Sequence, residues 1–269
     1  MKFLALLPAL LSMLLPGPAA IAAPVFNPGG AGEFRVELPG PLRELAGRGR
    51  QSPVAQALVT VAVPADFDSA RAWPILVVSA TSDPGFNSSR RLLAAYMAPA
   101  LAAGWVLIAA DPAQSVPVEN DDASLRFALN AAALAALELQ WPLAARSPLA
   151  FGGFSGGAKY SGWLAAAFAS QGRDVIGAFL AGINQDAMAK AARQFNVLNA
   201  AFRRIPVYLL GGERDTVATP EDHRSVDAEL REAGFTRVRL EWFPGAHDVD
   251  AAALRGALDW FRESAARPG

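Results

Sequence analysis

The sequence contains no cysteine and only two histidines among its 269 residues. The absence of cysteine excludes disulfide bonds, cysteine-ligated metals, a thiol nucleophile and a lipid anchor on an N-terminal cysteine. The two histidines form no His-Glu-x-x-His pattern, so no cluster of metal ligands is recognisable. Neither a Gly-x-Gly-x-x-Gly segment nor a phosphate-binding loop follows the first apolar segments. We therefore expect a protein that works without a metal or another cofactor.

Charge of one sign is not in excess either, because 24 Lys and Arg residues face 25 Asp and Glu residues, for a net charge of −1. No basic cluster offers an electrostatic attraction to nucleic acid, and we expect none to bind. After the N-terminus the chain has no further apolar run of the length that a membrane span needs, so we expect no stable membrane insertion.

The N-terminus has the three parts of a secretory signal peptide. Lys2 is followed by an apolar run over residues 3–15, then by the helix breaker Pro16, and then by the small residues Ala20 and Ala22. A membrane anchor is the alternative interpretation. It is disfavoured because a span needs about 20 apolar residues, and Pro16 interrupts this run.

The signal peptide sets the boundaries of the mature protein. Cleavage after Ala22 is favoured, because cleavage one residue later would leave Pro24 at the new terminus. We therefore predict a signal peptide over residues 1–22 and a single domain over residues 23–269. That domain is expected to be exported to the periplasm or secreted.

Apolar, β-branched segments alternate with longer helical patterns along most of the chain. Hydrophobic residues make up 52% of the sequence, which is ample for a large core. We expect strands at residues 57–63, 75–79, 105–110, 149–151, 175–180, 205–210 and 238–243, and an edge strand at 34–38. We expect helices at residues 88–103, 121–140 (capped by Asn120 or Asp121), 156–170, 186–202, 220–233 and 250–265, and a solvated loop at 40–52. This alternation predicts an α/β fold with a mostly parallel central sheet and helices on both faces.

One serine lies among four glycines in residues 152–157 (GGFSGG), between a predicted strand and a predicted helix. The spacing from Gly153 through Ser155 to Gly157 is Gly-x-Ser-x-Gly. On a sharp turn from strand to helix, this pattern exposes the serine hydroxyl above the sheet, and the glycines let the two elements approach closely. A glycine-rich loop with an idle serine is the alternative interpretation.

Two further loops carry the partners that a serine nucleophile needs. Asp215 follows the predicted strand at residues 205–210, and His247 follows the predicted strand at residues 238–243. Because the carboxyl ends of parallel strands meet at one edge of a sheet, we expect Ser155, Asp215 and His247 to lie near one another. In chain order and context, these motifs resemble the α/β-hydrolase superfamily, and most of all its small secreted esterases, carboxylesterases and polyester depolymerases.

The resemblance implies an α/β-hydrolase fold without a large cap domain and a cofactor-free serine esterase. Ser155 would attack a carboxylic ester, His247 would move the proton, and Asp215 would orient the histidine, with an acyl-enzyme as intermediate. The backbone N–H groups of Gly156 and Thr81 would form the oxyanion hole. The substrate would be a small-molecule or polymer ester.

Two alternatives to an esterase remain open. A serine peptidase uses the same three residues, but an ester is favoured because no large accessory domain that would restrict peptide access is expected here. A non-catalytic binding protein could keep the fold. That alternative rests on one departure from the family pattern: many relatives carry His-Gly where this chain has Ser79-Ala80.

Other residues compete for roles at the site. Asp186 is the alternative triad acid, because some family members place the acid after the preceding strand. His223 is expected on the surface, since it begins a helix among charged residues. Asp248 is expected to be a helix cap or a surface charge. Candidate pocket-lining residues are Asn184, Gln185, Phe86, Phe154 and Phe195, for which loop polarity (the two amides) or core packing (the three phenylalanines) is the default interpretation.

Overall fold

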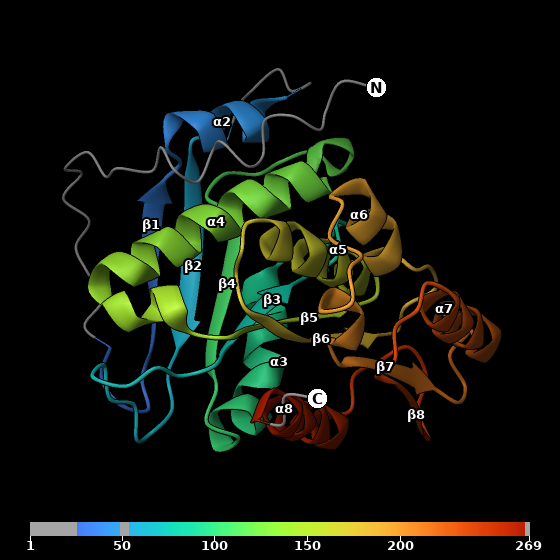
Figure 1. Cartoon of the computed structure of the whole chain (residues 1–269). Coiled ribbons are helices and arrows are strands. Elements are labelled where there is room, and N and C mark those ends of the chain that lie inside the picture. The colour runs from blue at the N-terminus through green and yellow to red at the C-terminus, as the bar shows by residue number, and fades with distance from the viewer. Residues whose placement is uncertain (1–25, 49–53, 267–269) are drawn as a thin grey trace.

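Eight strands form a single sheet in the order β1-β2-β4-β3-β5-β6-β7-β8 (Figure 1). The computed structural model describes residues 26–48 and 54–266; the predicted signal peptide lies outside them. The strands are β1 (Ala31–Glu37), β2 (Gln56–Ala62), β3 (Ile75–Ser79), β4 (Val106–Pro112), β5 (Leu149–Phe154), β6 (Val175–Ala181), β7 (Val207–Gly212) and β8 (Val238–Phe243). The α-helices are α2 (Gly40–Gly47), α3 (Ser89–Ala102), α4 (Ala123–Gln140), α5 (Gly156–Ser170), α6 (Met188–Gln194), α7 (Pro220–Glu232) and α8 (Ala251–Ala266), and the short 3₁₀ turns are η2 (Val118–Asn120), η3 (Pro142–Arg146) and η4 (Phe202–Arg204).

From β4 to β8 every neighbouring pair of strands is parallel, whereas β2 runs antiparallel to both β1 and β4. Strand β3 lies between β4 and β5, and all five of its residues, ILVVS, are buried. A strand covered on both faces reads as a continuous apolar run, which is the pattern that predicted it. The expected mostly parallel sheet is confirmed.

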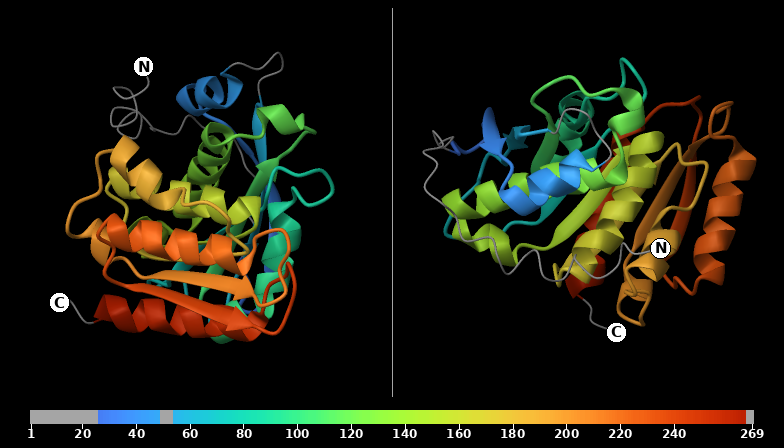
Figure 2. Two further views of the ribbon diagram at one scale, coloured as in Figure 1. Left: turned by 90° about the vertical axis from the view of Figure 1, so that its right-hand side faces the viewer. Right: turned by 90° about the horizontal axis from the view of Figure 1, so that it is seen from above.

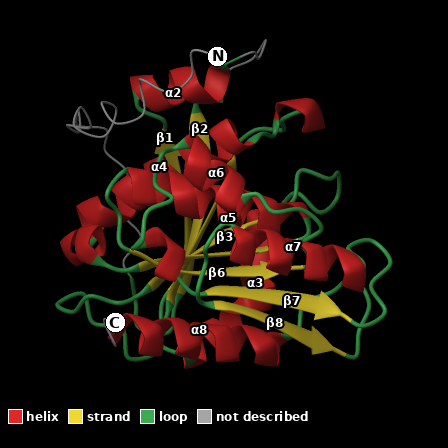
Figure 3. Cartoon of the chain, turned by 45° about the vertical axis from the view of Figure 1, so that its right-hand side comes forward, coloured by secondary structure: helices red, strands yellow, loops and turns green. Residues whose placement is uncertain are grey.

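Helices cover both faces of this sheet and divide the core into two parts (Figure 2). One part joins the sheet to α2, α4, α5, α6 and α7, and the other joins it to α3 and α8. Figure 3 shows β6, β7 and β8 side by side, with α8 next to them; α8 covers the same face of the sheet as α3. Among the described residues, every helix is too short or too polar to cross a lipid bilayer.

The solvated loop expected at residues 40–52 is wrong for its first part, which forms α2. Leu42, Leu45 and Ala46 are buried, and this spacing of three and four residues forms an apolar stripe on one helix face. The stripe belongs to the same core as α4. Arginine and glycine dominate the composition of this segment and concealed the stripe; residues 49–53 lie outside the described part of the chain.

Two predicted helix boundaries are also wrong. Helix α4 is capped by Asp122, whose side chain accepts the N–H of Leu125 at 2.9 Å, because Asn120 belongs to η2 and Asp121 pairs with Arg126. The helix expected at residues 186–202 stops at Gln194, and Asn196 adopts a positive φ of 55°. A left-handed residue ends an α-helix, and asparagine tolerates this conformation.

Candidate active site

Ser155 is the single residue that joins β5 to α5, and its backbone angles are φ 56° and ψ −124°. A positive φ is strained for any residue with a Cβ, so the surrounding structure must impose it. Part of that restraint comes from the next strand, because the N–H of Ser155 donates to the carbonyl of Ala181 at the end of β6 (2.9 Å). The serine is therefore held on a tight elbow at the carboxyl edge of the sheet.

The glycines on each side of Ser155 permit close contacts between backbone segments. A Cβ on Gly153 would lie 2.1 Å from the carbonyl oxygen of Gly157. A Cβ on Gly157 would lie 2.1 Å from the carbonyl oxygen of Ser79. Neither position has room for a side chain, so both glycines are required by the approach of β5, α5 and the end of β3.

The loop after β3 (residues 80–87) lies against the start of α5. A Cβ on Gly156 would lie 2.4 Å from Oγ1 of Thr81 and 3.4 Å from the Cα of Thr81. The Thr81 hydroxyl donates to Oδ2 of Asp83 at 2.6 Å. Gly156 is the first residue of α5, where N–H groups have no partner within the helix. The backbones of Thr81 and Gly156 are thus adjacent, beside Ser155.

Asp215 and His247 form the only histidine–carboxylate pair found in the described residues, with His247 Nδ1 2.7 Å from Asp215 Oδ2. The other carboxylate oxygen accepts the backbone N–H groups of Val217 (2.8 Å) and Ala218 (2.9 Å). Burial acts to raise the pKa of Asp215, but the hydrogen bonds from His247 and from these two N–H groups outweigh it and lower the pKa. A carboxylate so oriented accepts a hydrogen bond from Nδ1–H of His247, which favours the tautomer whose Nε2 is free to accept a proton.

Several contacts hold the histidine loop close to the acid loop. A Cβ on Gly212 would lie 2.1 Å from the carbonyl oxygen of Ala246, so glycine is required there. Arg214 donates its backbone N–H to Gly245 (2.9 Å) and its guanidinium to Pro244 (3.1 Å). Gly212 and Arg214 were not among the predicted site residues, although both precede Asp215 in the GGERD segment.

The ring of His247 also packs toward the elbow. Its centroid is 4.5 Å from the ring of Phe154, the residue before Ser155. Gly182, with a φ of 59°, lies against both rings, since a Cβ there would be 2.7 Å from Cε2 of Phe154 and 3.0 Å from Cε1 of His247. The structure therefore brings the elbow carrying Ser155 and the Asp215–His247 pair together at one end of the sheet.

The expectation that His223 lies on the surface is wrong, because this residue is fully buried. Nδ1 is 3.0 Å from the carbonyl oxygen of Thr219, and Nε2 is 3.1 Å from the carbonyl oxygen of Leu210. His223, Val226 and Leu230 share the inward face of α7, a helical spacing that the surrounding charges masked. His223 therefore ties α7 to the end of β7 through these two backbone contacts.

The other competing residues are distributed around the site. Asp186 is buried and accepts the N–H of Ala189 at the start of α6 (2.9 Å), and burial raises its pKa. Asp248 is exposed, and Asp250 instead accepts N–H groups at the start of α8. Asn184 and Gln185 are exposed, and Phe195 packs on Trp163. Phe86 is 76% exposed, so core packing is wrong for this residue.

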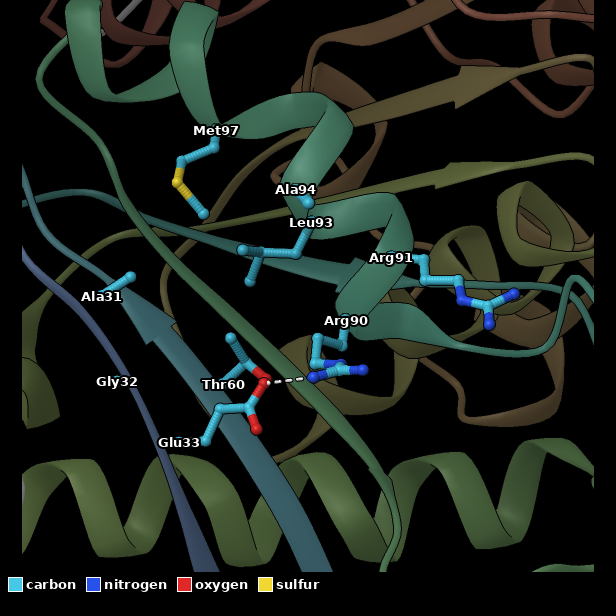
Figure 4. Close-up of a pocket in the computed structure, with 9 residues that line it drawn as sticks. All are labelled: Ala31, Gly32, Glu33, Thr60, Arg90, Arg91, Leu93, Ala94 and Met97. Carbon is cyan, nitrogen blue, oxygen red and sulfur yellow. Dashed lines mark hydrogen bonds and ion pairs between the residues drawn. The ribbon is translucent and has the colours of Figure 1, made fainter.

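A groove of about 500 Å³ lies elsewhere, between α3 and the first two strands (Figure 4). Leu93, Ala94 and Met97 form one wall, and the ion pair of Arg90 with Glu33 (3.0 Å) crosses it. None of the three predicted triad residues lines this groove. Across residues 26–48 and 54–266, no group of three or more His, Asp or Glu side chains is arranged to hold a metal ion.

Comparisons with known proteins identify the fold. No family model matches the sequence, and no curated protein matches it either. Among solved structures, a cold-adapted esterase from an Arctic intertidal metagenomic library is similar with a TM-score of 0.57 and 14% identity, covering 93% of this chain and 99% of that one. A serine hydrolase without a lid from Xanthomonas campestris is similar with a TM-score of 0.58 and 15% identity, covering 89% and 96%.

A third similar structure is the acylaminoacyl peptidase of Pyrococcus horikoshii, with a TM-score of 0.54 and 11% identity. The match covers 87% of this chain but only 40% of the peptidase. The chain has the α/β-hydrolase fold, and the solved structures of similar fold include an esterase, a serine hydrolase and a peptidase.

Proposed function

We propose that this protein is an exported serine hydrolase that cleaves carboxylic esters through Ser155, His247 and Asp215. The observation that carries the proposal is the oriented pair: Asp215 faces His247 at 2.7 Å while two backbone N–H groups hold its other oxygen. Further support comes from the strained elbow, where Ser155 directly follows Phe154, whose ring packs against His247. A buried carboxylate, an oriented imidazole and a serine hydroxyl on a strained turn are the parts of a serine hydrolase.

The acylation step uses all three side chains. His247 accepts the proton of the Ser155 hydroxyl at Nε2 as Oγ attacks the ester carbonyl carbon, and Asp215 stabilises the imidazolium that forms. The carbonyl oxygen becomes an oxyanion within reach of the N–H groups of Gly156 and Thr81. When the intermediate collapses, the bond to the alcohol oxygen breaks, and His247 returns the proton to the leaving alcohol.

Deacylation repeats the chemistry with water. His247 takes a proton from the water that attacks the acyl-enzyme, a second oxyanion forms in the same hole, and the proton returns to Ser155 as the carboxylic acid leaves. No step requires a cofactor. The free acid and the alcohol are the two products.

An ester is favoured over a peptide as the substrate class. The peptidases of similar fold are much longer chains, since the matches cover 40% and 35% of them. The similar structures matched over nearly their full length include an esterase and a serine hydrolase without a lid. A small-molecule or polymer ester that reaches an uncovered site fits this comparison.

The test is active-site labelling and turnover with Ser155→Ala. Residues 23–269 of the wild type and the variant are treated with a fluorophosphonate probe and then given short and medium p-nitrophenyl esters. We expect the wild type to be labelled and to hydrolyse the esters, and the variant to lose both, because its nucleophile is gone. Aminoacyl p-nitroanilides assayed in parallel compare esters with amides.

Ser161→Ala is the matched control. Ser161 also lies in α5, and its buried hydroxyl has no hydrogen-bond partner among the described residues. Its loss should leave labelling and turnover at the wild-type level. A folded wild-type protein that neither labels nor turns over would refute the hydrolase proposal and favour a non-catalytic binding protein. Faster cleavage of the anilides would favour a peptidase.

A further inference from the structure

Arg126 is the most deeply buried charged side chain near the candidate site. It belongs to α4 and has no exposed surface. Its guanidinium meets Asp121 through two atoms, with Nε 2.7 Å from Oδ1 and Nη2 2.5 Å from Oδ2. Nη1 lies 3.2 Å from Oδ1 of Asp111. Burial opposes a charge, but the two carboxylates outweigh it and raise the pKa of Arg126, so the side chain is a permanent cation.

The remaining donors of Arg126 reach the loop after β3. Nη2 lies 3.4 Å from the carbonyl oxygen of Thr81 and 3.3 Å from that of Asn87, at the two ends of the loop over residues 80–87. Nη1 donates to Oγ of Ser89 at 2.9 Å, and the same Oγ accepts the N–H of Ala80 at 3.2 Å. One planar group thus contacts both ends of the loop directly and its first residue through Ser89.

Asp111 anchors the other side of the same network. It accepts the N–H groups of Ser89 (2.9 Å) and Arg90 (3.1 Å) at the start of α3. The loop therefore cannot move relative to α3 or α4 without breaking a charged hydrogen bond. Charge-assisted bonds of this kind are about twice as strong as neutral ones.

We propose that Arg126 is a positioning residue that sets the oxyanion hole by holding the backbone of Ala80 and Thr81 from beneath. The loop begins with Ala80, directly after Ser79 at the end of β3. Its conformation is specified by the cluster of Arg126, Asp121, Asp111 and Ser89. Because Thr81 lies against Gly156, a small shift of the loop changes the position of the Thr81 N–H relative to that of Gly156, so the two no longer point at one oxyanion. This inference rests on the proposed function.

Arg126→Lys is the first variant. Lysine keeps a positive charge for Asp121, but its single ammonium cannot contact Ser89, Thr81 and Asn87 at once. Acylation and deacylation each pass through an oxyanion in the same hole. We therefore expect kcat and kcat/KM for a p-nitrophenyl ester to fall together by roughly tenfold or more, with KM nearly unchanged. The inhibition constant of an alkyl trifluoromethyl ketone should rise by the same factor, because the adduct carries an oxyanion.

Ser89→Ala is the second variant, and it removes only the hydroxyl that joins Arg126 to Ala80. It should show the same pattern at smaller size. Arg173→Lys is the matched control. Arg173 lies just before β6, at the end of the strands opposite to the candidate site, where it pairs with Glu138 and donates to the carbonyl of Ala144 (3.2 Å). It should alter stability without altering kcat or the inhibition constant.

The outcomes separate a positioning role from a structural one. If Arg126→Lys and Ser89→Ala lose stability as Arg173→Lys does but keep wild-type kcat and inhibition, the inference is overturned. Should Arg126→Lys fail to fold, wild-type kinetics of Ser89→Ala overturn it. If the wild type hydrolyses no ester, the proposed function fails instead. Amide hydrogen exchange of residues 80–82 then decides, and unchanged protection in both variants would refute the positioning of the loop.

Discussion

Asp215 and Asp186 are two buried carboxylates on neighbouring strand-end loops, and their surroundings shift their pKa values in opposite directions. Asp215 accepts three hydrogen bonds, which lower its pKa in spite of burial. Asp186 accepts the backbone N–H of Ala189, and burial dominates and raises its pKa. The sequence analysis predicted Asp215 as the triad acid and kept Asp186 as the alternative, because each follows a strand; in the structure Asp215 is the one that pairs with His247.

We predict that Asp215→Asn lowers kcat by about 10⁴-fold, while Asp186→Asn keeps most of the activity. An asparagine amide offers His247 an N–H and favours the tautomer with its proton on Nε2, which cannot accept from Ser155. At position 186 an amide oxygen can still accept the N–H of Ala189. Steady-state kinetics on one p-nitrophenyl ester measure both variants. Loss of activity in Asp186→Asn alone would reverse the assignment of the acid.

The same pair of variants has opposite effects on acid stability. A carboxyl with a lowered native pKa contributes stability that is present above its unfolded pKa of about 3.9 and is lost as the pH falls through the native value. Asp186, with a raised native pKa, instead favours the folded state in acid and disfavours it as the pH rises. Urea unfolding from pH 3 to 7 should therefore show a shallower acid loss in Asp215→Asn and a steeper one in Asp186→Asn.

At the scale of elements, the alternation of strands and helices was predictable from the sequence. Buried parallel strands are continuous apolar runs, whereas in a helix apolar residues recur every three to four positions. The segments β3, α5 and β8 have the predicted bounds. Helix α2 was missed because its stripe is short, and α6 was predicted too long because Asn196 ends it by a backbone conformation that composition does not reveal.

The elbow glycines give a prediction at this scale. We expect Gly157→Ala to destabilise the fold by about 3 kcal/mol or more, because the new Cβ would lie 2.1 Å from the backbone oxygen of Ser79. Gly256→Ala is the matched control: this glycine is exposed in α8 with nothing near its Cβ position, so alanine should stabilise by about 0.5–1 kcal/mol. Urea unfolding followed by tryptophan fluorescence measures both. Equal stabilities would contradict the packing of the elbow.

For the whole molecule, the candidate site is assembled from loops that are distant in sequence and adjacent at one edge of the sheet. The positions of Ser155, Asp215 and His247 were predictable, since parallel strands deliver their carboxyl ends to the same edge. The network of Arg126 that holds the loop beside them was not predictable. Arg126 is one of two charged residues in the otherwise apolar α4, and most of its partners come from segments distant in sequence: the loop after β3, the start of α3 and the end of β4. No local pattern therefore indicates what it contacts.

The N-terminal boundary of the folded domain gives the last prediction. Phe26 packs edge-on against Phe67 with ring centroids 6.1 Å apart, and Gly29 donates its N–H to the carbonyl of Pro64 at 2.7 Å. The chain is therefore tied to the core from residue 26 onward, just after the predicted cleavage site. We expect the exported protein to begin at Ala23. Residues 23–269 expressed alone should then have the same Tm as the exported protein.

Intact mass of the protein recovered from the periplasm or the medium tests the cleavage site, and thermal unfolding tests the boundary. Phe26→Ala is the control for the second measurement, because it should lower the Tm by removing the contact with Phe67. Retention of residues 1–22 on the exported chain would contradict a signal peptide and indicate an N-terminal anchor. A chain that starts at Ala23 but unfolds well below the exported form would show that the domain begins before that residue.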